Sequence, residues 1–437
     1  MLPISFARGH YKAVALVLGV ALYYFRFSLH PDGMTLYPRA AACMLIGQPM
    51  GNCSPGFTYP PLFGFAMIPF VFLPMWVRNV LWYAVLIGAT WGSFRLAESL
   101  VCQSLGIQFD EPQLTRFRLF SLILVLNFVL ADLENQAYDV LVLFFLLIGL
   151  NGLTRDNPVW PSIGFGLAAG LKATPLLFFP YILYKKGWKL FTLCVVGYLT
   201  LSLLPDLFLR AENGLTTYYG NWIRQVALQP FFAGDSGGMP RFWEGENTLN
   251  QSLRAFVYRI TLGMHIQQHF LLVLYGAYGV CLIYMMWVFS RSFRLQNYVV
   301  LDGSLLIICM LLLSPMSSKS HFVALMLPFM MITAYMMTDP RLRIGLRFVL
   351  VLSCALNNLT SKDLVGRQLS EMAGYGGSVT LGAITLALTI GYLVIKQKTH
   401  PSHQMKPQTG LLSAKQIRRN LQIADSQTQG VSRFVQN

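Results

Sequence analysis

Residues 137–153 read AYDVLVLFFLLIGLNGL, a run that is almost wholly apolar and long enough to cross the hydrocarbon layer of a membrane as a helix. Similar runs recur along the chain, and each predicts a spanning helix. These runs cover residues 12–28, 78–95, 117–131, 137–153, 158–171, 174–185, 189–209, 268–290, 298–315, 320–338, 343–359 and 375–395. The sequence therefore predicts an all-α, polytopic membrane protein with about twelve transmembrane helices.

The composition excludes an ordinary soluble protein. The 437 residues are 55% hydrophobic and only 12% charged, which leaves too much apolar surface for a soluble core to bury. The net charge of +15 comes from Lys and Arg residues dispersed in short clusters between the apolar runs. This pattern favours a lipid bilayer as the partner, and it argues against nucleic acid.

Residues 60–74, PPLFGFAMIPFVFLP, decide the predicted topology. The segment is apolar but short and rich in proline, so we interpret it as a helix near the membrane surface and not as a crossing. With this choice the basic clusters fall on one face, as the positive-inside rule expects of the cytoplasmic face of the plasma (inner) membrane. Residues 1–395 then form the transmembrane domain, with both termini cytoplasmic and the outer loops 29–77 and 210–267 on the periplasmic or exterior side.

Two further features concern the tail and the cysteines. Residues 396–437 are polar, basic and rich in Gln and Ser, and they predict a mostly disordered cytoplasmic tail. The cysteines show no spacing typical of a metal site, so we expect no metal and no other cofactor. Cys43 and Cys53 would pair if their segment faces an oxidising compartment.

Two groups of acidic residues are candidates for chemistry. Asp32 is the only carboxylate of the first outer loop, and it is either a general base or a turn residue beside Gly33. The second group lies in ADLENQAYD at residues 131–139. We interpret Asp132 and Asp139 as members of a solvated loop, with Asp132 capping the next helix, and Glu134 with its neighbour Gln136 as contacts for an acceptor sugar.

Five short motifs occur in one order along the chain. They are Asp32 followed by FTYPPL at 57–62, Asn135-Gln136, GLAAGLKATP at 166–175, NQSL at 250–253 with Arg259, and LSP at 313–315 with His321. In this order they resemble glycosyltransferase family 87 of the membrane-embedded C superfamily. That family includes mannosyltransferases of bacterial envelopes that use polyprenyl-phosphate mannose.

The resemblance implies an enzyme and assigns roles to residues. It implies a C-superfamily fold with a juxtamembrane, helical first outer loop, Asp32 as the base, and His321 near the donor. Ser318 and Ser320 stand where the family often has Trp and His, which leaves the sugar open.

The residue types suggest the remaining contacts. Lys172 suits a lipid phosphate, although a lysine that only anchors a helix end would look the same. Arg254 and Arg259 are further candidates for that phosphate. Tyr59, Asn250 and Gln251 are candidates for contacts with sugar.

The expected activity is that of a hexosyltransferase. A hexose, for which mannose is the family's precedent, would move with inversion from a polyprenyl-phosphate sugar to an envelope glycolipid or glycan on the non-cytoplasmic face. The alternatives are a lipid-linked sugar flippase or transporter, and an envelope polysaccharide polymerase.

Overall fold

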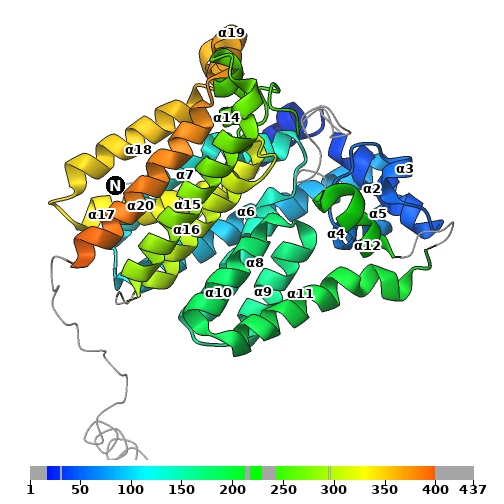
Figure 1. The fold of residues 1–437 in the computed structure, drawn as a ribbon, viewed down its shortest axis with the longest axis horizontal. Coiled ribbons are helices and arrows are strands. Elements are labelled where there is room, and N and C mark those ends of the chain that lie inside the picture. The colour runs from blue at the N-terminus through cyan, green and yellow to red at the C-terminus, as the bar shows by residue number, and fades with distance from the viewer. Residues whose placement is uncertain are drawn as a thin grey trace, which may run out of the picture. The chain divides into compact units, whose positions relative to one another are not determined.

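The computed structural model describes residues 17–29, 32–211, 217–228, 243–293, 295 and 297–398, and in these ranges every secondary-structure element is a helix (Figure 1). The described helices up to Ile395 belong to one compact unit. This confirms the all-α fold. Residues 399–437, which make up nearly all of the predicted disordered tail, lie outside the described residues.

The main apolar helices occupy the positions that the sequence predicts. They are α6 (Met75–Leu105), α7 (Glu111–Glu134), α8 (Asp139–Thr154), α9 (Val159–Leu171), α10 (Phe178–Lys186), α11 (Trp188–Phe208), α15 (Phe270–Ser292), α16 (Tyr298–Leu313), α17 (Met326–Thr338), α18 (Arg343–Asn358) and α20 (Ser378–Lys398). Their ends follow from local chemistry. For example, α6 ends at Gly106 in a left-handed conformation (φ 61°), and α7 begins with a capping box in which the backbone N–H of Gln113 donates to Asp110 Oδ1.

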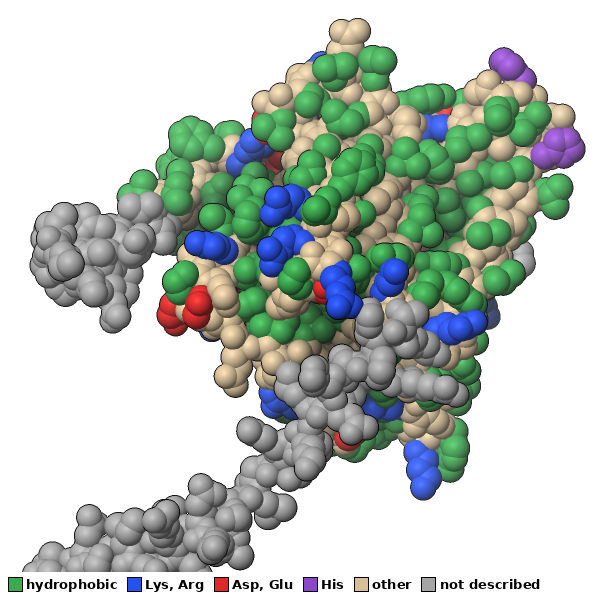
Figure 2. Space-filling model, turned by 90° about the vertical axis from the view of Figure 1, so that its left-hand side faces the viewer, with side chains coloured by type: hydrophobic (Ala, Val, Ile, Leu, Met, Phe, Trp, Pro, Cys, Tyr) green, Lys and Arg blue, Asp and Glu red, His purple; other side chains and the backbone are tan. Residues whose placement is uncertain are grey.

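Within the described ranges, six helices are long and apolar enough to cross a membrane, and a bent pair adds a seventh. Several other apolar helices, including α8, α9 and α16, are shorter. The chain is thus a multi-pass membrane protein, while the full number of crossings stays a prediction. Figure 2 shows apolar side chains spread over one face of the molecule, with many Lys and Arg side chains across its middle and lower part.

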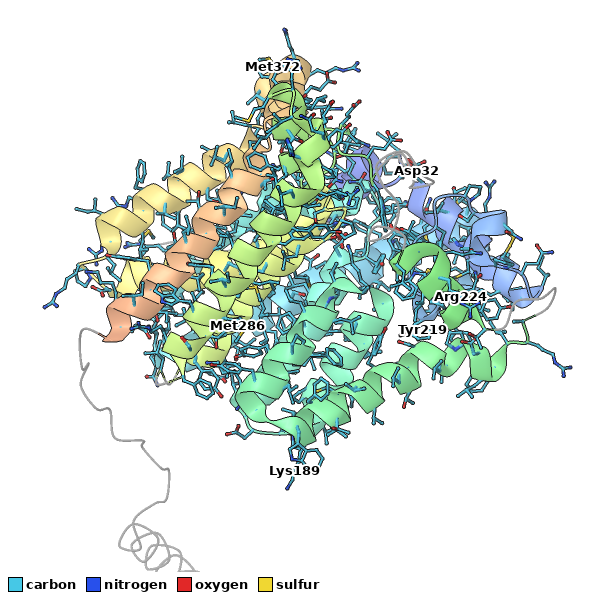
Figure 3. The ribbon with its side chains drawn as sticks, in the orientation of Figure 1. Asp32, Lys189, Tyr219, Arg224, Met286 and Met372 are labelled. Atoms are coloured by element: carbon cyan, nitrogen blue, oxygen red, sulfur yellow. A yellow bond between two sulfur atoms is a disulfide. The ribbon has the colours of Figure 1, made fainter. Side chains whose placement is uncertain are left out.

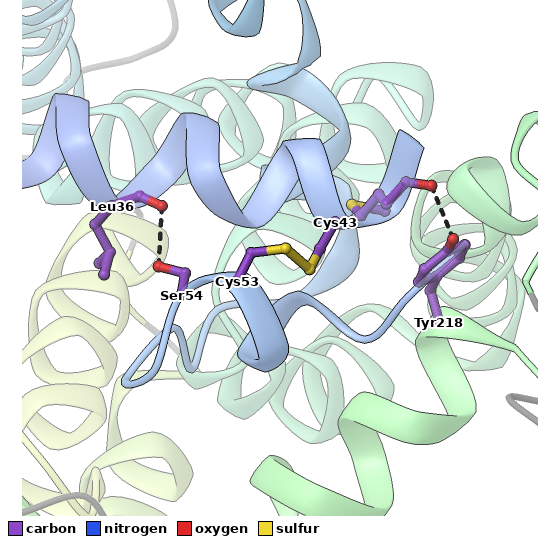
Figure 4. Close-up of a disulfide and its surroundings, with 6 residues drawn as sticks. Leu36, Cys43, Cys53, Ser54 and Tyr218 are labelled. Atoms are coloured by element: carbon purple, nitrogen blue, oxygen red, sulfur yellow. Dashed lines mark hydrogen bonds between the residues drawn. A yellow bond between two sulfur atoms is a disulfide. The ribbon is translucent and has the colours of Figure 1, made fainter. Parts of the chain in front are cut away.

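The segment that the sequence predicts to be the first outer loop, which we call the first outer segment, is helical as predicted. It contains α2 (Asp32–Leu45), α3 (Met50–Cys53), α4 (Pro61–Ala66) and α5 (Ile68–Val71). The last two are far too short to span a bilayer, which confirms that residues 60–74 are no crossing. Cys43 and Cys53 form a disulfide between α2 and α3, and beside it Ser54 Oγ donates to the Leu36 carbonyl at 3.1 Å (Figure 4).

The second outer segment is anchored on the first. Its described part contains α12 (Tyr218–Trp222), the π-helix η3 (Ile223–Ala227) and α14 (Leu253–Gly263). The Tyr218 hydroxyl donates to the Met44 carbonyl at 2.9 Å (Figure 4), and Trp222 Nε1 donates to the Thr58 carbonyl at 3.0 Å. The disulfide-linked segment therefore fixes the position of α12.

Close packing of α9 brings several helices together. A Cβ atom at Gly164 would lie only 2.5 Å from the backbone nitrogen of Gly149 on α8, so only glycine fits there. On its other side, a Cβ at Gly166 would lie 3.1 Å from the backbone of Gly197 on α11. Small residues allow such close approach of membrane helices. Gly164 and Gly166, the second of which begins the motif at 166–175, in this way set where α9 lies between α8 and α11.

Helix α19 (Lys362–Tyr375) was not predicted, and neither were α12 and α14 in the loop 210–267. Helix α19 follows α18 after a bend of 80°, and Gly366 within it has a φ of 79°. Its sequence is polar and contains a glycine, so it lacks the long apolar run by which the other helices are detected.

Candidate active site

A cavity of about 950 Å³ lies where the outer segments meet the ends of the helices. Residues from α2, α7, α8, α12, η3 and the Ser314–Ser320 segment line it. Its size suits a small-molecule or lipid headgroup site. Three regions with different chemistry make up its wall.

The first region is an ionic cluster around Asp139, the first residue of α8. Lys172 Nζ, just beyond the C-terminus of α9, lies 2.5 Å from Asp139 Oδ1. Ser320 Oγ donates to Asp139 Oδ2 at 3.3 Å, and His321 Nε2 lies 3.6 Å from the same oxygen. One carboxylate thus organises a lysine from one distant segment and a serine and a histidine from another. We call these four residues the inner cluster.

The orientation of His321 is fixed from the other side of its ring. The backbone N–H of Ser318 donates to His321 Nδ1 at 3.1 Å, within a capping box at the start of the 3₁₀ helix η6 (Lys319–Leu325). A nitrogen that accepts a hydrogen bond carries no proton, so a neutral His321 carries its proton on Nε2. That N–H faces Asp139 and the cavity, where it is able to donate to an oxyanion.

The second region is an aromatic wall. It is formed by Tyr59, Tyr198, Tyr219 and Trp222, with the Tyr198 and Tyr219 hydroxyls 2.7 Å apart. The rings of Tyr219 and Trp222 are stacked with their centroids 6.0 Å apart. Burial raises the pKa of Tyr59, so its hydroxyl stays protonated and able to donate. Flat rings with hydroxyl groups suit the apolar faces and polar edges of sugars.

The third region is a group of charges from four segments, which we call the outer cluster. It consists of Arg26, Glu134, Lys319, Lys362 and Asp363. Arg26 Nη1 lies 3.3 Å from Glu134 Oε2, and Arg26 also pairs with Asp363. The π-helix η1 (Tyr23–Phe27), α7, η6 and the start of α19 therefore meet at one edge of the cavity.

The sequence-predicted site residues divide into two sets. Four of them line the cavity: Lys172, His321, Tyr59 and Glu134. Six are not among the lining residues: Asp32, Gln136, Asn250, Gln251, Arg254 and Arg259. Asp32 is exposed at the first residue of α2, whose Tyr37 lines the cavity (Figure 3).

Gln136 is fully buried and serves the packing of the first outer segment. Its Oε1 accepts from the backbone N–H of Met34 at 2.8 Å, and its Nε2 donates to the Phe27 carbonyl at 3.3 Å. Its own carbonyl accepts from Trp82 Nε1 at 2.9 Å. These bonds fix the start of α2, next to Asp32.

Asn250 and Gln251 are also buried, and they join the second outer segment to the residues before η6. Asn250 Nδ2 donates to the Pro315 carbonyl at 3.2 Å, and its Oδ1 accepts from the Ser317 N–H at 3.2 Å. The Gln251 N–H donates to the Ser317 carbonyl at 2.7 Å. The motif therefore positions the segment that carries Ser320 and His321.

The two arginines lie behind this junction. Arg259 Nη1 donates to the carbonyls of Gly245, Asn247 and Asn250 at 3.0–3.2 Å, and burial lowers the pKa of Arg259 to about 10. Arg254 is buried, with its guanidinium 5.4 Å from the ring centroid of Phe270.

The interpretation of Asp132 and Asp139 as solvated loop residues is wrong. Both are buried, with relative exposures of 1% and 7%. Asp139 lies at the centre of the inner cluster, and the sequence alone does not bring it near Lys172 or His321. The density of acids in residues 131–139 was the available signal. Lys319 was also missed, because a lysine beside a Ser-Pro segment has no distinctive pattern.

The described part of the chain contains no group of three or more His, Cys, Asp or Glu side chains placed to hold a metal ion. The inner cluster offers one carboxylate and one imidazole, together with a lysine that is itself a cation. The available groups in the cavity are therefore hydrogen-bond donors, charges and aromatic rings.

Comparison with known proteins identifies the class as membrane-embedded glycosyltransferases. The family model described as Glycosyltransferase family 87 matches residues 57–315, more than half of the chain. The chain belongs to glycosyltransferase family 87, and it is a membrane glycosyltransferase with a lipid-linked sugar donor.

The chain was also compared with solved structures and with curated protein sequences. The crystal structure of ArnT from Cupriavidus metallidurans in the apo state is similar at 14% sequence identity and a TM-score of 0.41, covering 90% of this chain and 78% of that one. Among curated protein sequences, none matches this chain.

Proposed function

We propose that the protein transfers a hexose, with mannose as the first candidate, from a polyprenyl-phosphate sugar to an envelope glycolipid or glycan. The observation that carries the proposal is the placement of Lys172 and the Nε2–H of His321 together in a cavity with an aromatic wall. A cation and an N–H donor suit a phosphate that gains negative charge as it leaves. The aromatic wall suits the sugar beside it.

The proposed reaction is a single displacement with inversion. A base takes the proton of the acceptor hydroxyl, the hydroxyl oxygen attacks the anomeric carbon, and the bond from that carbon to the phosphate oxygen breaks. The lipid phosphate leaves with the electron pair. No cofactor is required, since the energy of the donor bond drives the transfer.

Asp32 is the proposed base. It is exposed and lies five residues before the cavity-lining Tyr37 on α2, which is about 7.5 Å along the helix axis, and this short separation supports the proposal. Asp139 is the competing candidate. Its charge is already compensated by Lys172, which makes it a weaker proton acceptor than a carboxylate without such a partner.

The side of the membrane is also a proposal. The disulfide of Cys43 and Cys53 lies in the segment that supports the cavity, and disulfides persist in oxidising compartments outside the cytoplasm. This supports a cavity on the periplasmic or exterior face of the plasma membrane, with the chain termini in the cytoplasm.

The test is transfer of radiolabelled sugar from a set of synthetic polyprenyl-phosphate sugars by membranes that contain wild type, Asp32→Asn or Asp139→Asn. Elution of each detergent-solubilised variant from a size-exclusion column checks its folding. Transfer by wild type that is lost in a well-folded Asp32→Asn variant supports the function and the base. Full activity of Asp32→Asn would reassign the base to Asp139, and no transfer by wild type from any donor would overturn the proposal.

A further inference from the structure

The cavity has cationic side chains at two separate places, whereas the phosphate of a lipid-linked donor is a single anion. Lys172 of the inner cluster pairs with Asp139. The outer cluster has three cations, Arg26, Lys319 and Lys362, and two carboxylates. It thus carries a net positive charge at an edge of the cavity that the donor phosphate, if held at Lys172, does not use.

Lys362 and Lys319 form no ion pair within the described part of the chain, and Lys319 is the more buried of the two. Its Nζ donates to the Thr360 carbonyl at 3.5 Å, and no carboxylate of the described residues lies within 4.0 Å of it. The side chain is partly buried. Withdrawing an ammonium group from water is costly unless an anion compensates its charge. The position of Lys319 therefore favours an anionic ligand.

The two carboxylates of the outer cluster are paired with Arg26 and form no ion pair with Lys319. Glu134 and Asp363 both pair with Arg26, on the side of the cavity formed by α7 and α19. Lys362, the neighbour of Asp363, is exposed and lines the same cavity. An anion beside Lys319 would consequently meet a second ammonium group and a guanidinium.

One phosphate does not serve both clusters. Lys319 and His321 are two residues apart on a 3₁₀ helix, where they point about 120° apart around the axis. His321 faces Asp139, and Lys319 faces the Thr360 carbonyl at the start of α19. The helix η6 thus presents one group to each end of the cavity.

We propose that Lys319, with Arg26 and Lys362 beside it, forms a second anion-binding subsite that holds the negatively charged group of the acceptor. This inference rests on the proposed function and adds the substrate class: the acceptor carries a phosphodiester or carboxylate close to its reacting sugar. The donor phosphate is the other possible source of an anion, and the experiment separates the two.

The first measurement is binding, which needs no turnover. Two short-chain lipids are titrated calorimetrically into the detergent-solubilised full chain: a neutral mannosyl diacylglycerol, and the same lipid with a phosphodiester between glycerol and mannose. We expect wild type to bind the phosphodiester lipid about tenfold more tightly, and Lys319→Gln to lose this preference. Lys319→Arg and the control Lys189→Gln, a lysine at the far end of α11 (Figure 3), should keep it.

The second measurement is transfer from polyprenyl-phosphate mannose to the same two lipids. Lys319→Gln should raise the KM of the phosphodiester acceptor about tenfold and leave the KM of the donor within about twofold. A raised donor KM with an unchanged acceptor KM would assign Lys319 to the donor and overturn the proposal. So would equal binding of both lipids by wild type, or a preference that survives in Lys319→Gln.

The two proposals fail in different ways. If wild type transfers sugar to neither lipid from any donor, the proposed transferase reaction fails, and the binding preference still decides whether the anion subsite exists. If transfer occurs and charge on the acceptor has no effect, the reaction stands and the subsite fails.

Discussion

Lys172 Nζ lies 2.5 Å from Asp139 Oδ1, which joins the C-terminus of α9 to the N-terminus of α8 inside the cavity. The two side chains are largely buried, with exposures of 15% and 8%. The pair holds an ammonium group beside His321 in a fixed place. Asp139 is accordingly a positioning residue for the ammonium group that would meet the donor phosphate.

Replacing Lys172 by Gln should remove both the phosphate contact and the partner of Asp139. Loss of one donor to a developing oxyanion costs about 100-fold in rate, so we expect kcat to fall at least that far. Leaving a buried carboxylate without its partner costs about 3–5 kcal/mol, so the melting temperature should fall as well. Transfer kinetics and thermal unfolding in detergent measure the two effects.

The double variant Lys172→Gln with Asp139→Asn separates stability from catalysis. Removing both charges leaves no uncompensated carboxylate, so the melting temperature should recover while kcat stays low. Recovery of the activity together with the stability would show that Lys172 only supports the fold.

The helix positions were predictable because an apolar run long enough to span a bilayer leaves a strong signal. The number of crossings was harder to predict. Helix α16 is buried by protein along almost all of its length, whereas α15 exposes many apolar side chains. Both read as continuous hydrophobic runs, because lipid and a protein interior select the same residues. Composition alone does not separate a crossing from a shorter buried helix.

Only part of the site was predictable, and for a related reason. Lys172 was found because it is a polar residue between two apolar runs, and His321 was found through the family resemblance. Arg259 and Gln136 were selected on the same grounds, yet they bond to backbone groups. A motif shows that a polar side chain is needed, but whether it faces a cavity or a carbonyl depends on the tertiary packing.

Opening the disulfide of Cys43 and Cys53 should loosen the support of α12. Reduction releases a constraint worth about 3 kcal/mol on the unfolded chain, so dithiothreitol should lower the melting temperature of wild type. Transfer activity should fall too, because Tyr218 bonds to Met44 beside the disulfide. The variant Cys43→Ser should show the lower temperature without reductant and no further response to it. As a control, Cys102→Ser, which changes a free cysteine, should respond to reductant as wild type does.

Replacing Gln136 by Ala should destabilise the first outer segment without changing the chemistry of the cavity wall. The buried N–H of Met34 and the carbonyl of Phe27 would both lose their partner, at a cost of about 3 kcal/mol. The melting temperature should fall. An increase in the KM of the acceptor with an unchanged melting temperature would instead indicate a direct contact with sugar.

The aromatic wall predicts a difference between two substitutions of Tyr219. Tyr219→Phe loses only the hydroxyl bond to Tyr198 and keeps the ring stacked on Trp222, so activity should stay within about threefold of wild type. Tyr219→Ala removes the stacking surface and should raise the KM of a substrate about tenfold. Equal loss in both variants would mean that the hydroxyl, and not the ring, is the important group.

Arg259 provides the sharpest contrast between a ligand contact and a structural role. Its guanidinium donates to three carbonyls of the 243–250 segment, and that segment bonds through Asn250 to Ser317 before η6. Lysine keeps the charge but not the planar group that reaches several acceptors at once. Arg259→Lys should therefore lower the melting temperature and kcat, because η6 shifts with its support, and leave the KM of the donor within about twofold. A residue that bound the donor phosphate through charge would behave in the opposite way. Arg259→Lys would then retain most of the activity, Arg259→Gln would raise the donor KM, and both variants would melt like wild type.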